Sequence, residues 1–288
     1  MSKIKITVDS ACDCASDIIE KYNIGVIPFS VLIDGSDKLD GVDINGKDVV
    51  DYVINTGVLP RTSAPSMEAY ENFFAKYAND SEYDYILHFS ISNEFSVAYN
   101  NAVKVSEKFN GKVKVIDTRA LSSGISLVML KCMDLLNQGK TIDEVIEESK
   151  HIAKCTQTSF TLEGLKMLYK GGRCSGLAFF MGKALGMMPS LLVRDGKLGV
   201  NRKYMFQKRF DSLVKRYVLD ILKQFPNVDK TRCFITHTPT DKEAIDIVKD
   251  IAKDYFDEVI ESDAGATICS HCGKNTIGLL YVCNEELK

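Results

Sequence analysis

The residues "YDYILHFSISNEFSVAYNNAVKVSEKFNGKVKVID" (83–117) contain a complete strand–helix–strand unit. Residues 83–92 and 112–117 are extended runs rich in β-branched and aromatic side chains. The residues between them show the apolar spacing of a helix. Because two strands joined through a helix run side by side in the same direction, this stretch predicts a right-handed βαβ unit and a parallel sheet.

The same alternation extends in both directions through the first half of the chain. Residues 3–10 and 25–34 read as further strands, and residues 46–57 as a helix that ends at Gly57. Two helix starts carry the spacing of a capping box, in which a side chain and a residue three positions later satisfy each other's backbone amides. These pairs are Ser10 with Asp13 and Thr141 with Glu144.

The order of elements changes near residue 155. Asp195 and Gly196 lie between two extended runs and predict a hairpin turn, while further strands and helices alternate towards the C-terminus. We therefore expect a two-domain α/β protein: an N-terminal domain (1–154) with a parallel sheet flanked by helices, and a C-terminal α/β domain (155–288) with a mixed sheet. Without an evident linker, the cleft between the domains is the default ligand site.

Composition excludes several classes of function. The 288 residues include 36 Lys and Arg against 39 Asp and Glu, a net charge of −3, which argues against a nucleic-acid-binding face. The first residues, "MSKIKITVDS", become polar too early for a signal peptide. No apolar run is long enough to predict a membrane span. We expect a cytoplasmic protein.

The stretch "ATICSHCGKN" (266–275) places His271 between Cys269 and Cys272. The two cysteines could hold a metal, form a redox pair or lie in the core. Nine cysteines, most of them in apolar runs, favour reduced core thiols, and a zinc site would require more ligands than this motif supplies. A redox or metal-binding enzyme that uses Cys269, Cys272 and His271 remains the alternative.

Hydroxyl side chains gather where predicted strands give way to helices. The motif "RTSAPS" contains Thr62 and Ser63, and "SISNEFS" contains Ser92 and Ser96. In a parallel α/β sheet such junctions share the carboxyl edge, where ligands bind. Ser and Thr are also good helix N-caps, which is the simpler explanation for any single loop. Together they predict a polar site without naming its ligand.

Two further features belong to residues 169–188. In "YKGGRCSG", Arg173 follows two glycines and is placed to meet an anion or simply to be solvated after a helix end. The adjacent "GLAFFMGKALGMM" predicts either an adaptable apolar wall or an ordinary core helix. The residues that would form this wall are Phe179, Phe180, Met181, Met187 and Met188. No nucleophile with its base is evident, so we expect a binding protein and not an enzyme.

Taken in order, these motifs resemble the DegV family of bacterial fatty-acid-binding proteins. The resemblance covers essentially the whole chain and is carried by "VDSACD" (8–13), "TSAPS" (62–66), "SISNEFSVAYNNA" (90–102), "VIDT" (115–118), "LKMLYKGGRCSG" (165–176), "MPSLLVRDGK" (188–197) and "SHCG" (270–273) with "IGLLY" (277–281). It implies the same two-domain fold.

The resemblance also implies a function. It predicts one long-chain fatty acid in a buried apolar tunnel, presented to a partner fatty-acid kinase that carries out the chemistry, with no cofactor and no metal on this chain. The implied carboxylate-binding residues are Thr62, Ser63, Ser92 and His271. Arg173 and Ser96 would support the polar end of the site, and the phenylalanines and methionines of residues 179–188 would line the acyl chain.

Overall fold

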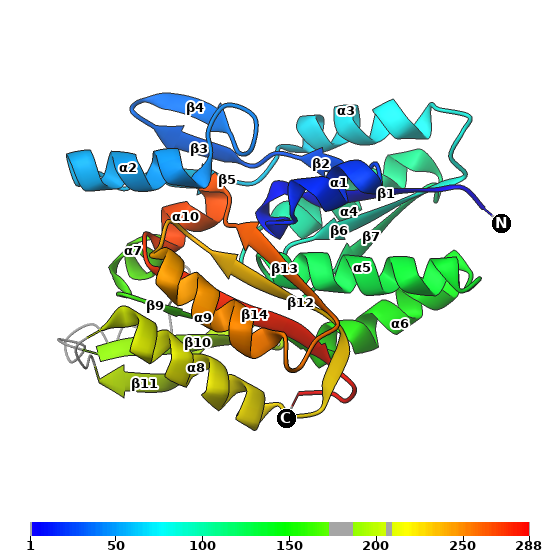
Figure 1. Cartoon of the computed structure of the whole chain (residues 1–288). Coiled ribbons are helices and arrows are strands. Elements are labelled where there is room, and N and C mark those ends of the chain that lie inside the picture. Colours follow the sequence, from blue (N-terminus) through cyan, green and yellow to red (C-terminus); the bar gives the residue numbers. More distant parts are fainter. Residues whose placement is uncertain (1, 173–186, 206–208, 288) are drawn as a thin grey trace.

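A computed structural model describes residues 2–172, 187–205 and 209–287 of the chain, and the side chain of Met187 is not described. Its first sheet has four parallel strands in the order β2-β1-β6-β7 (Figure 1). The strands are β1 (Ile4–Asp9), β2 (Gly25–Ile27), β6 (Tyr85–Ser90) and β7 (Val113–Asp117). The strand–helix–strand unit at 83–117 is confirmed, with α4 (Ala98–Ser106) joining β6 to β7.

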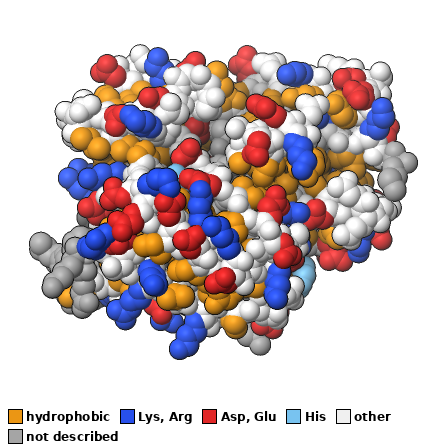
Figure 2. Space-filling model, in the orientation of Figure 1, with side chains coloured by type: hydrophobic (Ala, Val, Ile, Leu, Met, Phe, Trp, Pro, Cys, Tyr) orange, Lys and Arg blue, Asp and Glu red, His pale blue; other side chains and the backbone are white. Residues whose placement is uncertain are grey.

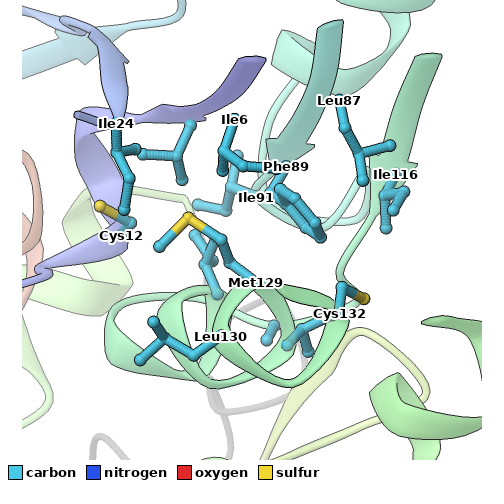
Figure 3. Packing of buried hydrophobic residues seen from close by; sticks show 14 of the residues in the cluster. Ile6, Cys12, Ile24, Leu87, Phe89, Ile91, Ile116, Met129, Leu130 and Cys132 are labelled. Atoms are coloured by element: carbon cyan, nitrogen blue, oxygen red, sulfur yellow. The ribbon is translucent and has the colours of Figure 1, made fainter. Parts of the chain in front are cut away.

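Helices cover both faces of this sheet, which explains why its strands read as apolar runs. On one face Met129 points from α5 (Ser123–Asn137) towards Ile6 and Phe89 (Figure 3). On the other face Phe74 of α3 (Met67–Ala78) packs against His88 of β6. The remaining helical elements of this half are η1 (Ser10–Cys12), α1 (Ser16–Lys21), η2 (Glu107–Phe109) and α6 (Ile142–Cys155).

A small antiparallel sheet projects from this half. Its order is β4-β3-β5, with β3 (Ser30–Ile33), β4 (Ser36–Leu39) and β5 (Arg61–Ser63). The expected single strand at 25–34 is therefore wrong: the chain leaves the parallel sheet after Ile27 and enters the small sheet at Ser30. Helix α2 (Gly46–Thr56) packs with this sheet against α10 (Ala266–Cys272) from the far end of the chain.

The second half forms a seven-stranded mixed sheet in the order β11-β10-β9-β14-β12-β13, with β8 also paired to β14. Strands β12 and β13 run parallel, and the other pairs are antiparallel. The strands are β8 (Thr156–Gln157), β9 (Ser159–Leu162), β10 (Met187–Arg194), β11 (Lys197–Met205), β12 (Val228–His237), β13 (Glu258–Asp263) and β14 (Thr276–Cys283). The helices are α7 (Lys166–Lys170), α8 (Phe210–Gln224), α9 (Lys242–Ala252) and α10.

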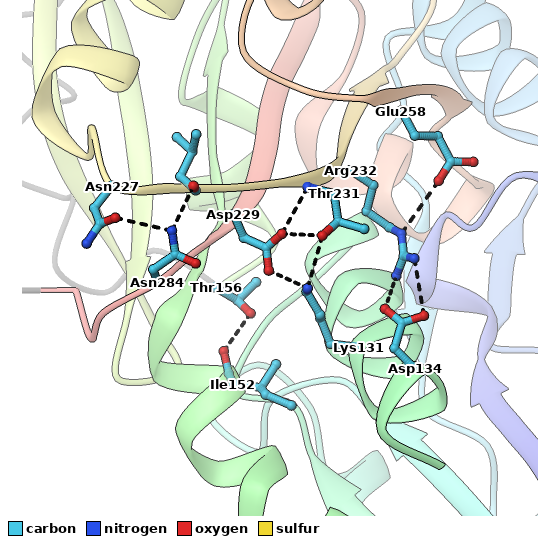
Figure 4. A network of polar contacts seen from close by, with 11 residues as sticks. Lys131, Asp134, Ile152, Thr156, Asn227, Asp229, Thr231, Arg232, Glu258 and Asn284 are labelled. Carbon is cyan, nitrogen blue, oxygen red and sulfur yellow. Dashed lines mark hydrogen bonds and ion pairs between the residues drawn. The ribbon is translucent and has the colours of Figure 1, made fainter. Parts of the chain in front are cut away.

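The two halves share a core and a polar seam. The cluster of buried apolar residues under the parallel sheet includes Phe234 and Leu280 from the mixed sheet. Arg232 on β12 donates to both carboxylate oxygens of Asp134 on α5, at 2.7 and 3.2 Å, beside an ion pair between Lys131 and Asp229 (Figure 4). A boundary between residues 154 and 155 stays a prediction, because the apolar core is continuous across it.

Local signals had mixed outcomes. The capping box of Thr141 and Glu144 is confirmed, and Gly57 ends α2 in the left-handed conformation. The capping box of Ser10 and Asp13 is wrong: Asp13 accepts a hydrogen bond from the distant Gly265 amide, while α1 begins only at Ser16. The Asp195–Gly196 turn is confirmed, with both residues at positive φ (50° and 77°).

Among the helices that the structure describes, none has the length and apolar character needed to cross a membrane.

Candidate ligand-binding site

Helix α10 is held between the halves by two buried aspartates. Asp40 accepts hydrogen bonds from the amides of Ala266 (2.7 Å) and Thr267 (3.3 Å), and Asp13 accepts one from Gly265 (2.8 Å). Both aspartates come from the first 40 residues, so the N-terminal half fixes the position of a helix that begins 226 residues after Asp40.

The environment of Asp13 favours its neutral form. Burial raises the pKa of Asp13 to about 8 and outweighs the hydrogen bonds from Ser122 and Gly265, which lower it, while the charges of Asp40 and Asp263 raise it further. Ser122 Oγ lies 2.5 Å from Asp13 Oδ2. We infer that Asp13 is protonated at neutral pH and acts as a positioning residue for α10.

His271 extends from the last turn of α10 to the small sheet. Its Nε2 lies 2.8 Å from Thr62 Oγ1, a hydrogen bond whose direction depends on the imidazole tautomer. Thr62 sits on β5 opposite the buried Val31, so its side chain shares the inner face of the small sheet. A Cβ on Gly171 would meet the His271 ring, which explains a glycine at this position of "YKGGR".

Thr62 and His271 lie on the wall of a mainly apolar cavity. The space between its walls is about 590 Å³, including the part open to solvent. A second cavity of about 340 Å³ shares Leu121, Phe160, Ile268 and Cys272 with the first. The first cavity is lined by Phe29, Thr62, Ala64, Ile91, Phe95, Ser96, Leu121, Phe160, Leu168, Leu198, Thr267, Ile268, His271 and Cys272. These residues come from both halves of the chain, so the cavity lies between them.

The structure brings together some of the expected carboxylate-binding residues. Thr62, Ser96 and His271 line the cavity. Ser92 is buried, but its hydroxyl donates to the Gly196 carbonyl (3.0 Å) and so attaches the second-half hairpin to the first half. Ser63 is exposed at the end of β5.

The expected acyl-chain residues are not seen at the cavity. Arg173, Phe179, Phe180 and Met181 lie outside the described residues, as does the side chain of Met187. Met188 is buried in a separate cluster with Leu192, Tyr204 and Leu213. In the described part of the chain, aromatic and branched side chains from other segments form the apolar walls instead: Phe29, Ile91, Phe95, Phe160, Leu168, Leu198 and Ile268.

Sequence reasoning missed these wall residues because they come from six distant segments. One local signal was available within "ATICSHC": Thr267 and His271 are four positions apart, as are Ile268 and Cys272. On a helix both pairs fall on one face. A short helix there, recognised in advance, would have identified four of the fourteen cavity residues.

A metal or redox site at Cys269, Cys272 and His271 gains no support from the geometry. Within the described ranges, no group of three His, Cys, Asp or Glu residues is arranged to hold a metal ion. The Cys269 thiol donates to the Ala264 carbonyl (3.3 Å), and burial raises its pKa well above the ordinary value. A thiol in that state is a poor nucleophile.

The surface shows no concentrated charge on the face drawn in Figure 2. Basic and acidic side chains are interspersed there, with apolar side chains between them. Such mixing produces no extended field of one sign.

Comparisons with known proteins agree with this architecture. A model of the DegV family matches residues 3–284. A fatty acid-binding protein of Thermotoga maritima is 29% identical over 285 residues, covering 96% of each chain. The structure of a DegV lipid-binding protein from the same organism superimposes with a TM-score of 0.86 at 26% identity, covering 99% of each chain.

A fatty-acid-binding DegV family protein from Thermus thermophilus gives a TM-score of 0.88 at 24% identity, covering 98% of this chain and 99% of that one, which shows the shared fold. The family match covers nearly every residue, and the same α/β architecture recurs in these structures. This chain belongs to the DegV family.

Proposed function

We propose that this protein is a cytoplasmic carrier that binds one long-chain fatty acid in its interdomain cavity and presents the carboxylate to a partner fatty-acid kinase. The observation that carries the proposal is the apolar cavity with the Thr62–His271 pair on its wall. The fatty-acid ligand of the Thermotoga relative supports the choice of ligand.

Burial of the chain supplies most of the affinity. About 14 methylenes of a hexadecanoyl chain, at about 0.8 kcal/mol each, give roughly 11 kcal/mol of gross driving force. Immobilisation of the ligand removes a large part of this. The first cavity is lined mainly by apolar side chains and shares Leu121, Phe160, Ile268 and Cys272 with the second. We propose that the two cavities together form the acyl tunnel.

The polar end selects an acid through hydroxyl and imidazole groups. None of the fourteen described lining residues is a lysine or arginine. Thr62 and His271 are the primary candidates for contact with the carboxylate, with Ser96 beside them. Ser63 and Ser92 are weaker candidates because the first is exposed and the second is engaged with Gly196. Arg173 remains a proposed support for this end.

Extraction of lipid from the purified protein tests the proposal. Organic extraction followed by mass spectrometry should release about one acyl chain per protein, and protein stripped of lipid should bind hexadecanoic acid again. His271→Ala protein, purified and extracted in the same way, is the control for adventitious lipid, because it should retain less fatty acid than the wild type. Protein that is repeatedly recovered empty and that refuses added fatty acid would overturn the proposal.

A further inference from the structure

Thr267 is a buried hydroxyl on the cavity wall for which no described residue supplies a hydrogen-bond partner. Its side chain is only 4% exposed. The neighbouring hydroxyls behave differently: Ser270 donates to the Ala266 carbonyl (2.7 Å), and Thr276 donates to the Cys272 carbonyl (3.3 Å). Hydroxyls in and near helices commonly bond to a carbonyl four residues back in this way. Thr267 departs from that pattern.

The position of Thr267 distinguishes it from other buried polar groups that lack a partner. Thr158 Oγ1 and Gln157 Oε1 also have none among the described residues, but neither residue lines the cavity. A buried hydroxyl that lacks a partner is unfavourable, and such groups are uncommon in folded proteins. Beside a cavity, a ligand can supply the missing partner.

Thr267 lies one helical turn before His271, so both side chains fall on the cavity face of α10. Side chains at this spacing are about 5–6 Å apart at their Cβ atoms. A carboxylate has two oxygens, each able to accept hydrogen bonds. One oxygen can therefore meet the Thr62–His271 pair while the other meets Thr267.

We propose that Thr267 Oγ1 donates a hydrogen bond to the carboxylate of the bound fatty acid and is a specificity-determining residue of the site. This inference rests on the proposed function. It also supplies the second hydroxyl donor that the Ser92 side chain does not offer while it is bonded to the Gly196 carbonyl.

Two substitutions of Thr267 separate its hydroxyl from its shape. Thr267→Val keeps the size of the side chain and removes the hydroxyl, whereas Thr267→Ser keeps the hydroxyl and removes the methyl group. Thr158→Val, which removes another buried hydroxyl that lacks a described partner but does not line the cavity, is the control. Each protein is stripped of lipid and titrated with hexadecanoic acid by calorimetry, and its melting temperature is measured without ligand.

Thr267→Val should weaken hexadecanoic acid binding roughly 10- to 100-fold. Thr267→Ser should stay within about threefold of the wild type because it keeps the donor, and Thr158→Val should do so because its hydroxyl does not line the cavity. Ligand-free Thr267→Val should melt no lower than the wild type, since a methyl group replaces a hydroxyl that lacks a partner. A loss of affinity without a loss of stability is the signature of a ligand contact.

Three results would overturn the inference. They are a Thr267→Val variant that binds hexadecanoic acid as tightly as the wild type, a Thr267→Ser variant that loses as much affinity as Thr267→Val, and a ligand-free Thr267→Val variant that melts below the wild type, since the last would show that the hydroxyl stabilises the empty protein. Wild-type protein that fails to bind hexadecanoic acid would overturn the proposed function and this inference together. If the wild type binds hexadecanoic acid and Thr267→Val binds it equally well, only the role of Thr267 is overturned and the proposed function stands.

Discussion

Two groups of buried polar side chains, one in the core of the parallel sheet and one around α10, use the same residue types. In the first, which we name the Asp9 cluster, Asp9 accepts hydrogen bonds from Tyr70 (2.7 Å), Ser90 (2.6 Å) and the Ile91 amide (2.9 Å). Its Oδ1 lies 3.2 Å from His88 Nε2. Burial raises the pKa of Asp9, but these partners outweigh it and leave the pKa below its usual value.

The second group, the α10 cluster, comprises Asp13, Asp40, Thr62, Thr267 and His271. It also joins carboxylates, hydroxyls and an imidazole, but in the described part of the chain the imidazole bonds to the hydroxyl of Thr62. Burial raises the pKa of Asp13 to about 8, because the hydrogen bonds from Ser122 and Gly265 lower it by less than burial raises it. The hydroxyl of Thr267 faces no described partner.

The difference shows how a binding site can be told from a structural network. Every hydroxyl of the Asp9 cluster has a protein partner, and the side chains of His88 and Asp9 are fully buried and do not line the cavity, so the cluster offers a ligand no accessible group. The α10 cluster borders a cavity and retains such capacity. Residue type alone does not separate the two.

Removal of His88 should produce the largest effect. His88→Ala leaves the Asp9 carboxylate buried without its imidazole, and breaking a buried pair in this way lowers the free energy of unfolding by about 3–5 kcal/mol. Urea unfolding measures the change. The folded fraction should still bind hexadecanoic acid, because neither His88 nor Asp9 lines the cavity and the cluster meets the cavity wall only through the backbone amide of Ile91.

His151 provides the matched control for that variant. Its side chain is 55% exposed and pairs with Glu286 at 3.3 Å, so His151→Ala should change stability by less than about 1 kcal/mol. If His88→Ala and His151→Ala lowered the free energy of unfolding equally, the distinction between the buried Asp9 cluster and a surface ion pair would be contradicted.

The fold was largely accessible from sequence because its signals are local. The apolar runs at β1, β6 and β7, the helices between them and the Asp195–Gly196 turn each report their own structure. The break after Ile27 was not accessible, because the small sheet forms through pairing of β3 with the distant β5. The Asp13 side chain was misassigned for the same reason, since its partner is Gly265.

The site was only partly accessible. Thr62 and His271 were identified through the family resemblance, and the structure places them 2.8 Å apart. Ser92 was grouped with them because it follows a strand, but its partner, Gly196, belongs to a hairpin of the other half. Contacts between remote segments leave no periodic signal in either segment, so neither this bond nor the apolar wall could be read from the chain.

Removal of His271 should weaken ligand binding more than it lowers stability, whereas removal of His88 should mainly lower stability. His271→Ala should weaken hexadecanoic acid binding by about 1–3 kcal/mol, since the carboxylate loses a donor, and should change stability less than His88→Ala does. Calorimetric titration of lipid-free protein measures the affinity. Thr62→Val is the companion variant, because it removes the hydroxyl that bonds to the imidazole. If both variants bind as tightly as the wild type, the headgroup lies elsewhere.

Asp13→Asn should produce the smallest effect, a change in how stability depends on pH. This variant tests the pKa difference between Asp13 in the α10 cluster and Asp9 in the Asp9 cluster. Asp13 has a folded-state pKa of about 8, against an ordinary value of 3.8. Between these values the unfolded chain carries an ionised Asp13 while the folded protein keeps it protonated. Folding then requires uptake of a proton, so the wild type loses stability as the pH rises. Asparagine has the same shape and no titration.

From pH 6 to pH 7, the free energy of unfolding of Asp13→Asn should therefore gain up to about 1.4 kcal/mol relative to the wild type. Urea unfolding at both pH values measures this difference. Asp9→Asn is the control: the folded-state pKa of Asp9 is below its ordinary value, so Asp9 is ionised in both states over this range and its variant should show no such slope. Parallel profiles for Asp13→Asn and wild type would mean that Asp13 is already ionised in the folded protein over this pH range.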